Sequence, residues 1–353
     1  MPRPYNPAVP RLLLLLLPTL ALAACRSVAA PVPCSGEIED RSGVFVLYGD
    51  TRPRLAAEVW RESSDRERLL VVDAIAAERP DFVLNSGDLV GRGESPWEWA
   101  RFDAEIAPLQ EAGIPYYASL GNHDLSGDDA HALHNFFARF PHLRGRRWYE
   151  VRHRALALIV LDTNLRNLDA AQRRDQLEWL HDRLAAAEAD PGVRWVMVVT
   201  HYPPYTNATL HGPSAWVREH VLGAARTHPK LAAVVAGHVH SYERFAEPLP
   251  GGRQLHVLVS GGGGAPLVSL RRDGPFPDLY SGPRSFHYLR VTVSPDQLLL
   301  ETVMLLPGDR WEVVDTVRVD DAAGSPVHAP ESPSRNEPPV ERGARHLPPA
   351  ERP

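Results

Sequence analysis

The sequence predicts an α/β (α+β) fold, a four-layer sandwich of two mixed β-sheets flanked by helices. In the first two thirds of the chain, apolar runs of strand length alternate with amphipathic helical patterns, as in βαβ units. The last third instead contains successive stretches that favour strands, as in a meander. Alternation that gives way to a meander indicates two mixed sheets.

Each element is predicted from the spacing of its apolar residues. Apolar runs too short for a helix predict strands at 44–48, 82–84, 116–118, 156–161, 195–199, 231–235, 255–259, 286–293, 298–306 and 311–319. An amphipathic pattern with a period of about 3.6 predicts helices at 55–78, 97–112, 130–140, 170–189 and 214–228.

Length and charge limit the possible functions. With 353 residues and 44% hydrophobic residues, the chain can bury a large core. The formal net charge of -6 argues against a non-specific polyanion binder, so no nucleic-acid partner is expected.

The first residues have the composition of an export signal. Arginines precede the apolar run 12–17, which is shorter than the roughly 20 residues of a membrane-spanning helix. Residues 22–25 (Leu-Ala-Ala-Cys) resemble a bacterial lipobox, in which Cys25 is acylated and becomes the new N-terminus. We therefore expect an exported protein with a lipid anchor in the cell envelope. The alternative is a secreted or periplasmic protein cleaved upstream, in which Cys25 and Cys34 close a small disulfide loop.

Composition also divides the chain into segments. Pro-rich stretches with few large apolar residues at both ends bury too little surface to offset the entropy of ordering. The expected organisation is a signal peptide at 1–24, a linker at 25–40, one folded domain at 41–321 and a disordered tail at 322–353.

Five short blocks that carry metal-binding side chains follow five of the predicted strands. In α/β sheets, ligands bind just beyond the strand ends, so these blocks are expected to meet. Carboxylate, amide and imidazole donors suit manganese, iron or zinc better than calcium. Two cations about 3.5–4 Å apart need a shared anionic bridge, and Asp88 follows a central strand. The blocks are Gly49-Asp50, Gly87-Asp88, Gly121-Asn122-His123-Asp124, His201 and Gly237-His238-Val239-His240.

These blocks, in this order, resemble the calcineurin-like metallophosphoesterase family from about Phe45 to Leu305. The family pattern is Asp-x-His, Gly-Asp-x-x-Asp or a variant, Gly-Asn-His-Asp/Glu, a lone His, and Gly-His-x-His. The resemblance implies a metallophosphoesterase fold and two divalent or trivalent metal ions. It further implies that Asp50 and His240 bind the first metal, that Asp88 bridges, and that Asn122, His201 and His238 hold the second.

The stretch 237–244, followed by four glycines at 261–264, looks most like the purple acid phosphatase branch. That branch has a metal-binding Tyr three positions after the bridging Asp, where this chain has Gly91. The resemblance therefore implies a purple-acid-phosphatase-like bacterial phosphoesterase without the charge-transfer colour. The four glycines are expected to allow close packing of a strand end near the metals.

The first block departs from the family pattern, because Arg52 stands where the family has His. An obligate cation cannot bind a metal, so the first site is one ligand poorer. Three hypotheses remain open. Arg52 clamps a phosphate oxygen of the substrate, or it weakens the first metal site, or it points away into a carboxylate pair.

The expected reaction is attack by a metal-activated hydroxide on the phosphorus of a phosphate ester. His123, next to the ligand Asn122, is expected to protonate the leaving alkoxide. Asp124 is expected to hold that imidazole in its correct tautomer. His211, in the loop after His201, is a candidate substrate contact.

The sequence thus predicts a phosphatase that hydrolyses small phosphate monoesters. The enzymatic alternative is a phosphodiesterase of the cyclic nucleotide type. Two non-enzymatic alternatives remain. One is a non-catalytic phosphate-ligand binding protein, in which Arg52 binds the ligand. The other is a structural envelope protein that retains the fold without metals.

Overall fold

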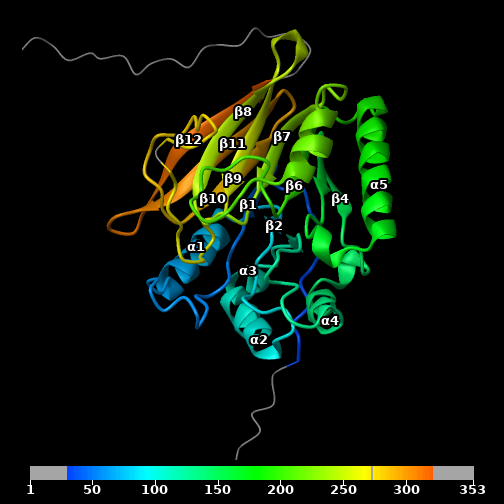
Figure 1. Cartoon of the computed structure of the whole chain (residues 1–353). Coiled ribbons are helices and arrows are strands. Elements are labelled where there is room, and N and C mark those ends of the chain that lie inside the picture. The colour runs from blue at the N-terminus through cyan, green and yellow to red at the C-terminus, as the bar shows by residue number, and fades with distance from the viewer. Residues whose placement is uncertain (1–29, 272, 321–353) are drawn as a thin grey trace, which may run out of the picture.

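The computed structural model describes residues 30–271 and 273–320, which form two six-stranded sheets with helices around them (Figure 1). The expected signal peptide, Cys25 and the expected tail lie outside the described residues. Within the described part, no helix is long and apolar enough to span a membrane.

The first sheet is mixed. Its strands are β1 (Val44–Tyr48), β2 (Val83–Asn85), β3 (Tyr116–Ala118), β10 (His287–Val293), β11 (Gln297–Leu306) and β12 (Arg310–Asp320). The order is β12-β11-β10-β1-β2-β3, in which β1, β2 and β3 are parallel and the C-terminal strands form the expected antiparallel meander.

The second sheet is also mixed. Its strands are β4 (Tyr149–His153), β5 (Leu156–Val160), β6 (Trp195–Thr200), β7 (Leu231–Ala236), β8 (Tyr242–Pro248) and β9 (Gln254–Ser260). The order is β4-β5-β6-β7-β9-β8, with parallel pairing from β5 to β9 and antiparallel strands at both edges. The edge strands β4 and β8 were absent from the sequence prediction, because their sequences mix apolar and charged residues.

Apolar side chains on both faces of β6 explain the layered packing. Met197 and Val199 join the core that the two sheets share, whereas Val196 and Val198 join the core beneath the long helix α5 (Ala170–Ala189). Successive side chains of a strand point to opposite faces, so a continuous apolar run is buried on both. Figure 1 shows α5 alongside the second sheet. The predicted layered sandwich is confirmed.

The other helices differ from the predictions at their ends. The expected helix 55–78 begins only at Asp65, because Glu58 accepts the Leu55 amide in an irregular turn. The expected helix 97–112 is divided at Ile106, after which a new helix begins at Ala107 with Pro108 in its first turn. The remaining segments are α1 (Asp65–Glu78), α2 (Pro96–Glu105), α3 (Ala107–Glu111), α4 (Asp129–Arg139), the 3₁₀ turns Pro141–Leu143, Leu165–Asn167 and Pro250–Gly252, and a π-helix at Val217–Leu222.

Part of the expected linker is folded against the first sheet. Cys34 is buried, its amide donates to the carbonyl of Arg139, and the carbonyl of Ser35 accepts the amide of Tyr116 on β3. Burial raises the pKa of the Cys34 thiol to about 12. The structure therefore corrects the predicted linker boundary, and Cys34 belongs to the core.

Candidate metal centre

Strand ends of both sheets bring the predicted donors together. Asp50 and Asp88 follow the parallel neighbours β1 and β2, while His201 and His238 follow the parallel neighbours β6 and β7. The carboxyl ends of parallel strands lie at the same edge of a sheet, and here these edges of the two sheets face each other. Segments far apart in the sequence thereby share one site.

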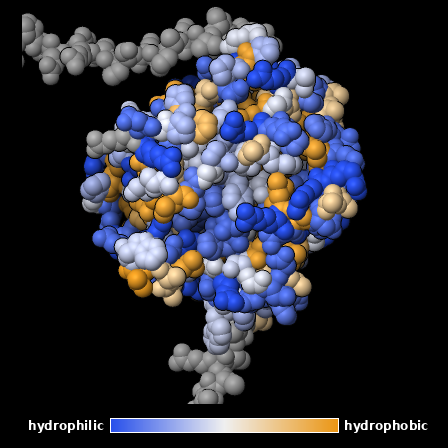
Figure 2. Space-filling model, in the orientation of Figure 1, coloured by the Kyte–Doolittle hydropathy of each residue, from blue (hydrophilic) through white to orange (hydrophobic). Residues whose placement is uncertain are grey.

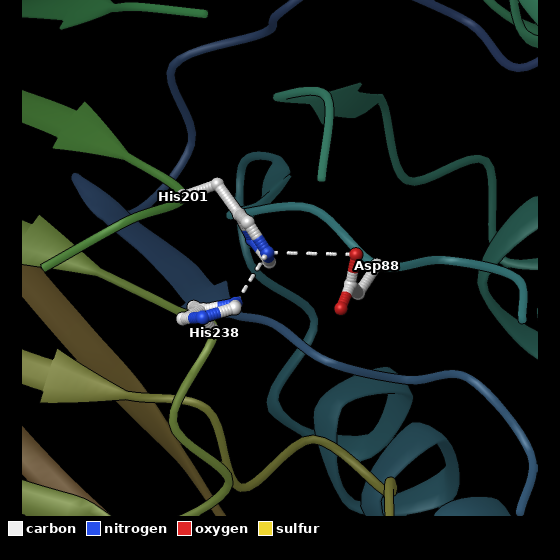
Figure 3. A group of neighbouring side chains, drawn as sticks. All are labelled: Asp88, His201 and His238. Atoms are coloured by element: carbon white, nitrogen blue, oxygen red, sulfur yellow. Dashed lines mark hydrogen bonds and ion pairs between the residues drawn. The ribbon is translucent and has the colours of Figure 1, made fainter. Parts of the chain in front are cut away.

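One group of donors consists of Asp88, His201 and His238 (Figure 3). Nε2 of His201 lies 3.5 Å from Oδ1 of Asp88 and 3.3 Å from Nδ1 of His238. The amide oxygen Oδ1 of Asn122 lies 3.1 Å from the same Nε2. These four side chains are the ones that the family resemblance assigned to the second metal and its bridge.

A second group consists of Asp50, Asp88 and His240, so the two groups share Asp88. Nε2 of His240 lies 3.6 Å from Oδ1 of Asp50. In each group, the potential ligand atoms all lie within 4.8 Å of one another. One carboxylate common to two donor groups is what a bridged metal pair requires.

Two backbone carbonyls fix the tautomers of His201 and His240. Nδ1–H of His201 donates to the carbonyl of Ser86 (3.0 Å), and Nδ1–H of His240 donates to the carbonyl of Pro266 (2.8 Å). Each Nε2 therefore keeps a lone pair directed into the site. Nε2 of His201 and Oδ1 of Asn122 are both acceptors, so they repel each other at this distance. A cation bound to both atoms would remove this repulsion. The donor set thus fits divalent cations of the borderline class.

Electrostatics keeps the imidazoles ready to bind a metal. Burial lowers the pKa of His201, lowers that of His238 well below its usual value and lowers that of His240 to about 3, so all three are neutral at neutral pH. Burial raises the pKa of Asp88, but the surrounding histidines outweigh it and hold the pKa below its usual range. The pKa of Asp50 is raised, first by burial and then by the negative charge of Asp88. Bound cations would offset the repulsion between these two carboxylates.

Three of the donors have left-handed backbone conformations, which are uncommon outside glycine. The φ angles are 59° at Asp50, 58° at Asp88 and 69° at His238. Such residues cost on the order of 1–3 kcal/mol each and cluster at functional sites. Both carboxylate oxygens of Asp50 accept the amide of His238, which ties the end of β1 to the end of β7.

Close approach explains the glycines next to the donors. A Cβ at Gly121 would lie 2.2 Å from Oδ1 of Asp88, and one at Gly261 would lie 2.6 Å from Oδ2 of Asp50. Both separations are below van der Waals contact. The expectation that 261–264 packs a strand end against the site is therefore confirmed, since Gly263 also donates to the carbonyl of Gly49.

The predicted contact between Asp124 and the imidazole of His123 is wrong. The buried carboxylate of Asp124 accepts backbone amides of residues 88–90 and of Gly121. Nδ1–H of His123 instead donates to the carbonyl of Gly91 at 3.0 Å. Because carboxylates bind amides in the turns that follow strands, Asp124 joins the ends of β2 and β3 and so positions Asp88.

Arg52 is buried beside the site, but its guanidinium turns toward Glu58. Both Nη atoms donate to that carboxylate at 2.9 Å, while Nε is buried without a hydrogen-bond partner among the described residues. This geometry agrees with the third hypothesis, a carboxylate pair. Arg52 is still near the metal ligands, since its charge is the second cause, after burial, of the low pKa of His240.

Two further aromatic rings, those of His211 and Tyr202, lie against the ring of His238. The rings of His211 and His238 are 4.7 Å apart, which places the candidate substrate contact beside a donor. Tyr202, which the sequence analysis did not identify, lies 4.3 Å from His238 between ring centroids. Its position directly after His201 was the available signal.

Comparison with known proteins agrees with this geometry. The model of the family described as Calcineurin-like phosphoesterase matches residues 44–242. The chain belongs to this family. It is therefore a hydrolase that acts on phosphoric ester bonds, and the family uses a dimetal centre.

Individual relatives are distant. The chain is 28% identical over 209 residues to a probable cyclic nucleotide phosphodiesterase of a Synechococcus strain, covering 58% of this chain and 71% of the relative. It is 29% identical over 256 residues to tartrate-resistant acid phosphatase type 5 of Sus scrofa, covering 62% and 69%. A purple acid phosphatase from yellow lupin seeds shares the fold with a TM-score of 0.60 at 21% identity, covering 86% of this chain and 59% of that one.

The shared carboxylate predicts distinct metal losses in two variants. Asp88→Asn should lower the stoichiometry from about two ions per chain to less than about one, because both donor groups lose a member. His240→Ala should lower it to about one, because only one group is affected. Metal analysis of each protein after dialysis measures both values. Equal losses in the two variants would contradict the assignment of Asp88 as the bridge.

Proposed function

We propose that the protein is a metal-dependent phosphatase that hydrolyses small phosphate monoesters. The observation that carries this proposal is the pair of donor groups that share Asp88. The relatives include tartrate-resistant acid phosphatases of Sus scrofa and Mus musculus, at 29% and 28% identity, and the chain shares the fold of a purple acid phosphatase. This similarity supports a monoester substrate.

Bound metal ions would lower the pKa of a water molecule and neutralise charge on the phosphoryl group. Asp50, Asp88 and His240 would hold one ion. Asp88 would also hold the other, with three further ligands, Asn122, His201 and His238. Manganese, iron and zinc suit these donors. An ion held by Asp50 would have one imidazole ligand fewer than in the family pattern, because Arg52 stands where the family has a histidine.

His123 is the proposed proton donor to the leaving group. Its amide donates to Oδ1 of Asp88 at 2.8 Å, so the residue is fixed beside the proposed bridge. The bond from Nδ1–H to the Gly91 carbonyl fixes the ring and makes Nε2 the nitrogen that exchanges a proton. His211 would contact the phosphoryl group or the leaving group from the opposite loop.

A phosphodiesterase activity is the second candidate, because three relatives carry the name probable cyclic nucleotide phosphodiesterase. Its substrate would be a cyclic nucleotide or another diester. The ligand groups serve both reactions, so the difference depends on the space around the phosphorus.

Turnover of matched esters tests the proposal. With added manganese, iron or zinc, kcat/KM for p-nitrophenyl phosphate should exceed that for bis(p-nitrophenyl) phosphate at least about tenfold. His123→Ala should lower kcat about 100-fold for an alkyl phosphate, but far less for p-nitrophenyl phosphate, whose leaving group needs no proton. A higher value for the diester would favour the phosphodiesterase. Phosphate binding without turnover would favour a binding protein, and protein without bound metal would favour a structural role.

We also propose that the protein is exported and held at the cell envelope through an acylated Cys25. The support is the apolar run 12–17 followed by residues 22–25. When the protein is produced in bacteria with radiolabelled palmitate, the wild type should incorporate label and Cys25→Ser should not. Cys34→Ser is the matched control and should label normally. Unlabelled wild-type protein would contradict the anchor.

A further inference from the structure

From three segments around the candidate metal centre, we infer that the protein selects phosphate esters whose leaving group is apolar, of the aryl or branched-alkyl class. The inference rests on the proposed function and names its substrate class. The carrying observation is an apolar rim, defined as Val59, Trp60, Leu210 and Leu267. These side chains are 75%, 75%, 75% and 37% exposed.

The segment 265–270 forms one edge of the metal centre. The amide of Ala265 donates to the carbonyl of Asp50, and the amide of Val268 donates to the carbonyl of His240. The carbonyl of Pro266 accepts Nδ1–H of His240. Leu267 is therefore exposed on a segment bonded to two proposed metal ligands.

The Trp60 loop is tied to the same segment. Nη1 of Arg61 donates to the carbonyl of Pro266 at 3.0 Å, so one carbonyl binds both Arg61 and His240. Arg61 also lies near His211, because its charge, after burial, lowers the pKa of that imidazole. Val59 and Trp60 directly precede this anchored arginine.

Leu210 follows residues that pair with the end of the same segment. Ala208 forms a bridge to Leu270, and Thr209 donates its amide to the carbonyl of Ser269 at 3.2 Å. The next residue but one, His211, contacts the proposed ligand His238. Three separate segments thus each place an exposed apolar side chain within one residue of a group that contacts a proposed metal ligand or the carbonyl bonded to one.

The rim consists of four side chains, which fits a small leaving group. Exposed apolar residues cost little when scattered, but their gathering around a polar site marks ligand contact. On the face drawn in Figure 2, hydrophobic surface forms small separate areas among hydrophilic ones, unlike a continuous docking face. Metal ligands would hold the phosphoryl group while the rim covers an apolar ring or chain.

Binding of two phosphonates that are not hydrolysed tests the inference. By calorimetry, the manganese-loaded protein should bind phenylphosphonate about tenfold more tightly than methylphosphonate. Trp60→Ala and Leu210→Ala should each lower this ratio to about threefold or less, while leaving methylphosphonate affinity within about twofold. The control for these two variants is Val313→Ala, an exposed apolar residue outside the rim, on strand β12 and 44% exposed, which should keep the full ratio.

The outcomes separate the inference from the proposed function. Equal affinity for the two phosphonates, no binding of either, or an unchanged ratio in Trp60→Ala and Leu210→Ala would overturn the inference, even if p-nitrophenyl phosphate is hydrolysed. A tenfold ratio that depends on the rim, in a protein that hydrolyses no ester, would support apolar ligand selection and overturn the phosphatase proposal.

Discussion

The carboxylate of Asp88 lies buried where strand ends of both sheets meet, and the charge at that point has to be balanced. Asp50 lies beside it, and the Nε2 lone pairs of His201 and His240 are directed to the same region. Among the described residues, the atoms that converge there are mostly acceptors, which repel one another in a buried site. Cations would convert this repulsion into coordination, and for this reason the site is best understood as a metal centre.

Much of the surrounding structure serves to hold these acceptors together. Asp50 and Asp88 have left-handed backbones, and each such residue persists only where neighbouring bonds impose it. The carboxylate of Asp124 supplies four such bonds, to amides that follow β2 and β3. Gly121 and Gly261 leave the space that the carboxylates fill. The backbone strain at the metal-binding residues is therefore offset by buried hydrogen bonds, made by groups that have no proposed contact with the substrate.

The sequence was sufficient for the sandwich and for the convergence of the donors, because strand periodicity and the position of each block after a strand are local properties. Side-chain partners were less predictable, because they depend on how loops cross. Asp124 binds amides rather than His123, and Arg52 pairs with Glu58 six residues on. Burial of Cys34 likewise depends on a contact with α4 that composition does not encode. Loop paths, rather than element patterns, determine these contacts.

Anomalous diffraction from crystals grown with manganese would test the central claim most directly. The account predicts two peaks about 3.5–4 Å apart, with Asp88 between them. One peak should lie within coordination distance of His201 and His238, and the other within coordination distance of His240. A single peak remote from Asp88, or no peak at the convergence of the strand ends, would contradict the account.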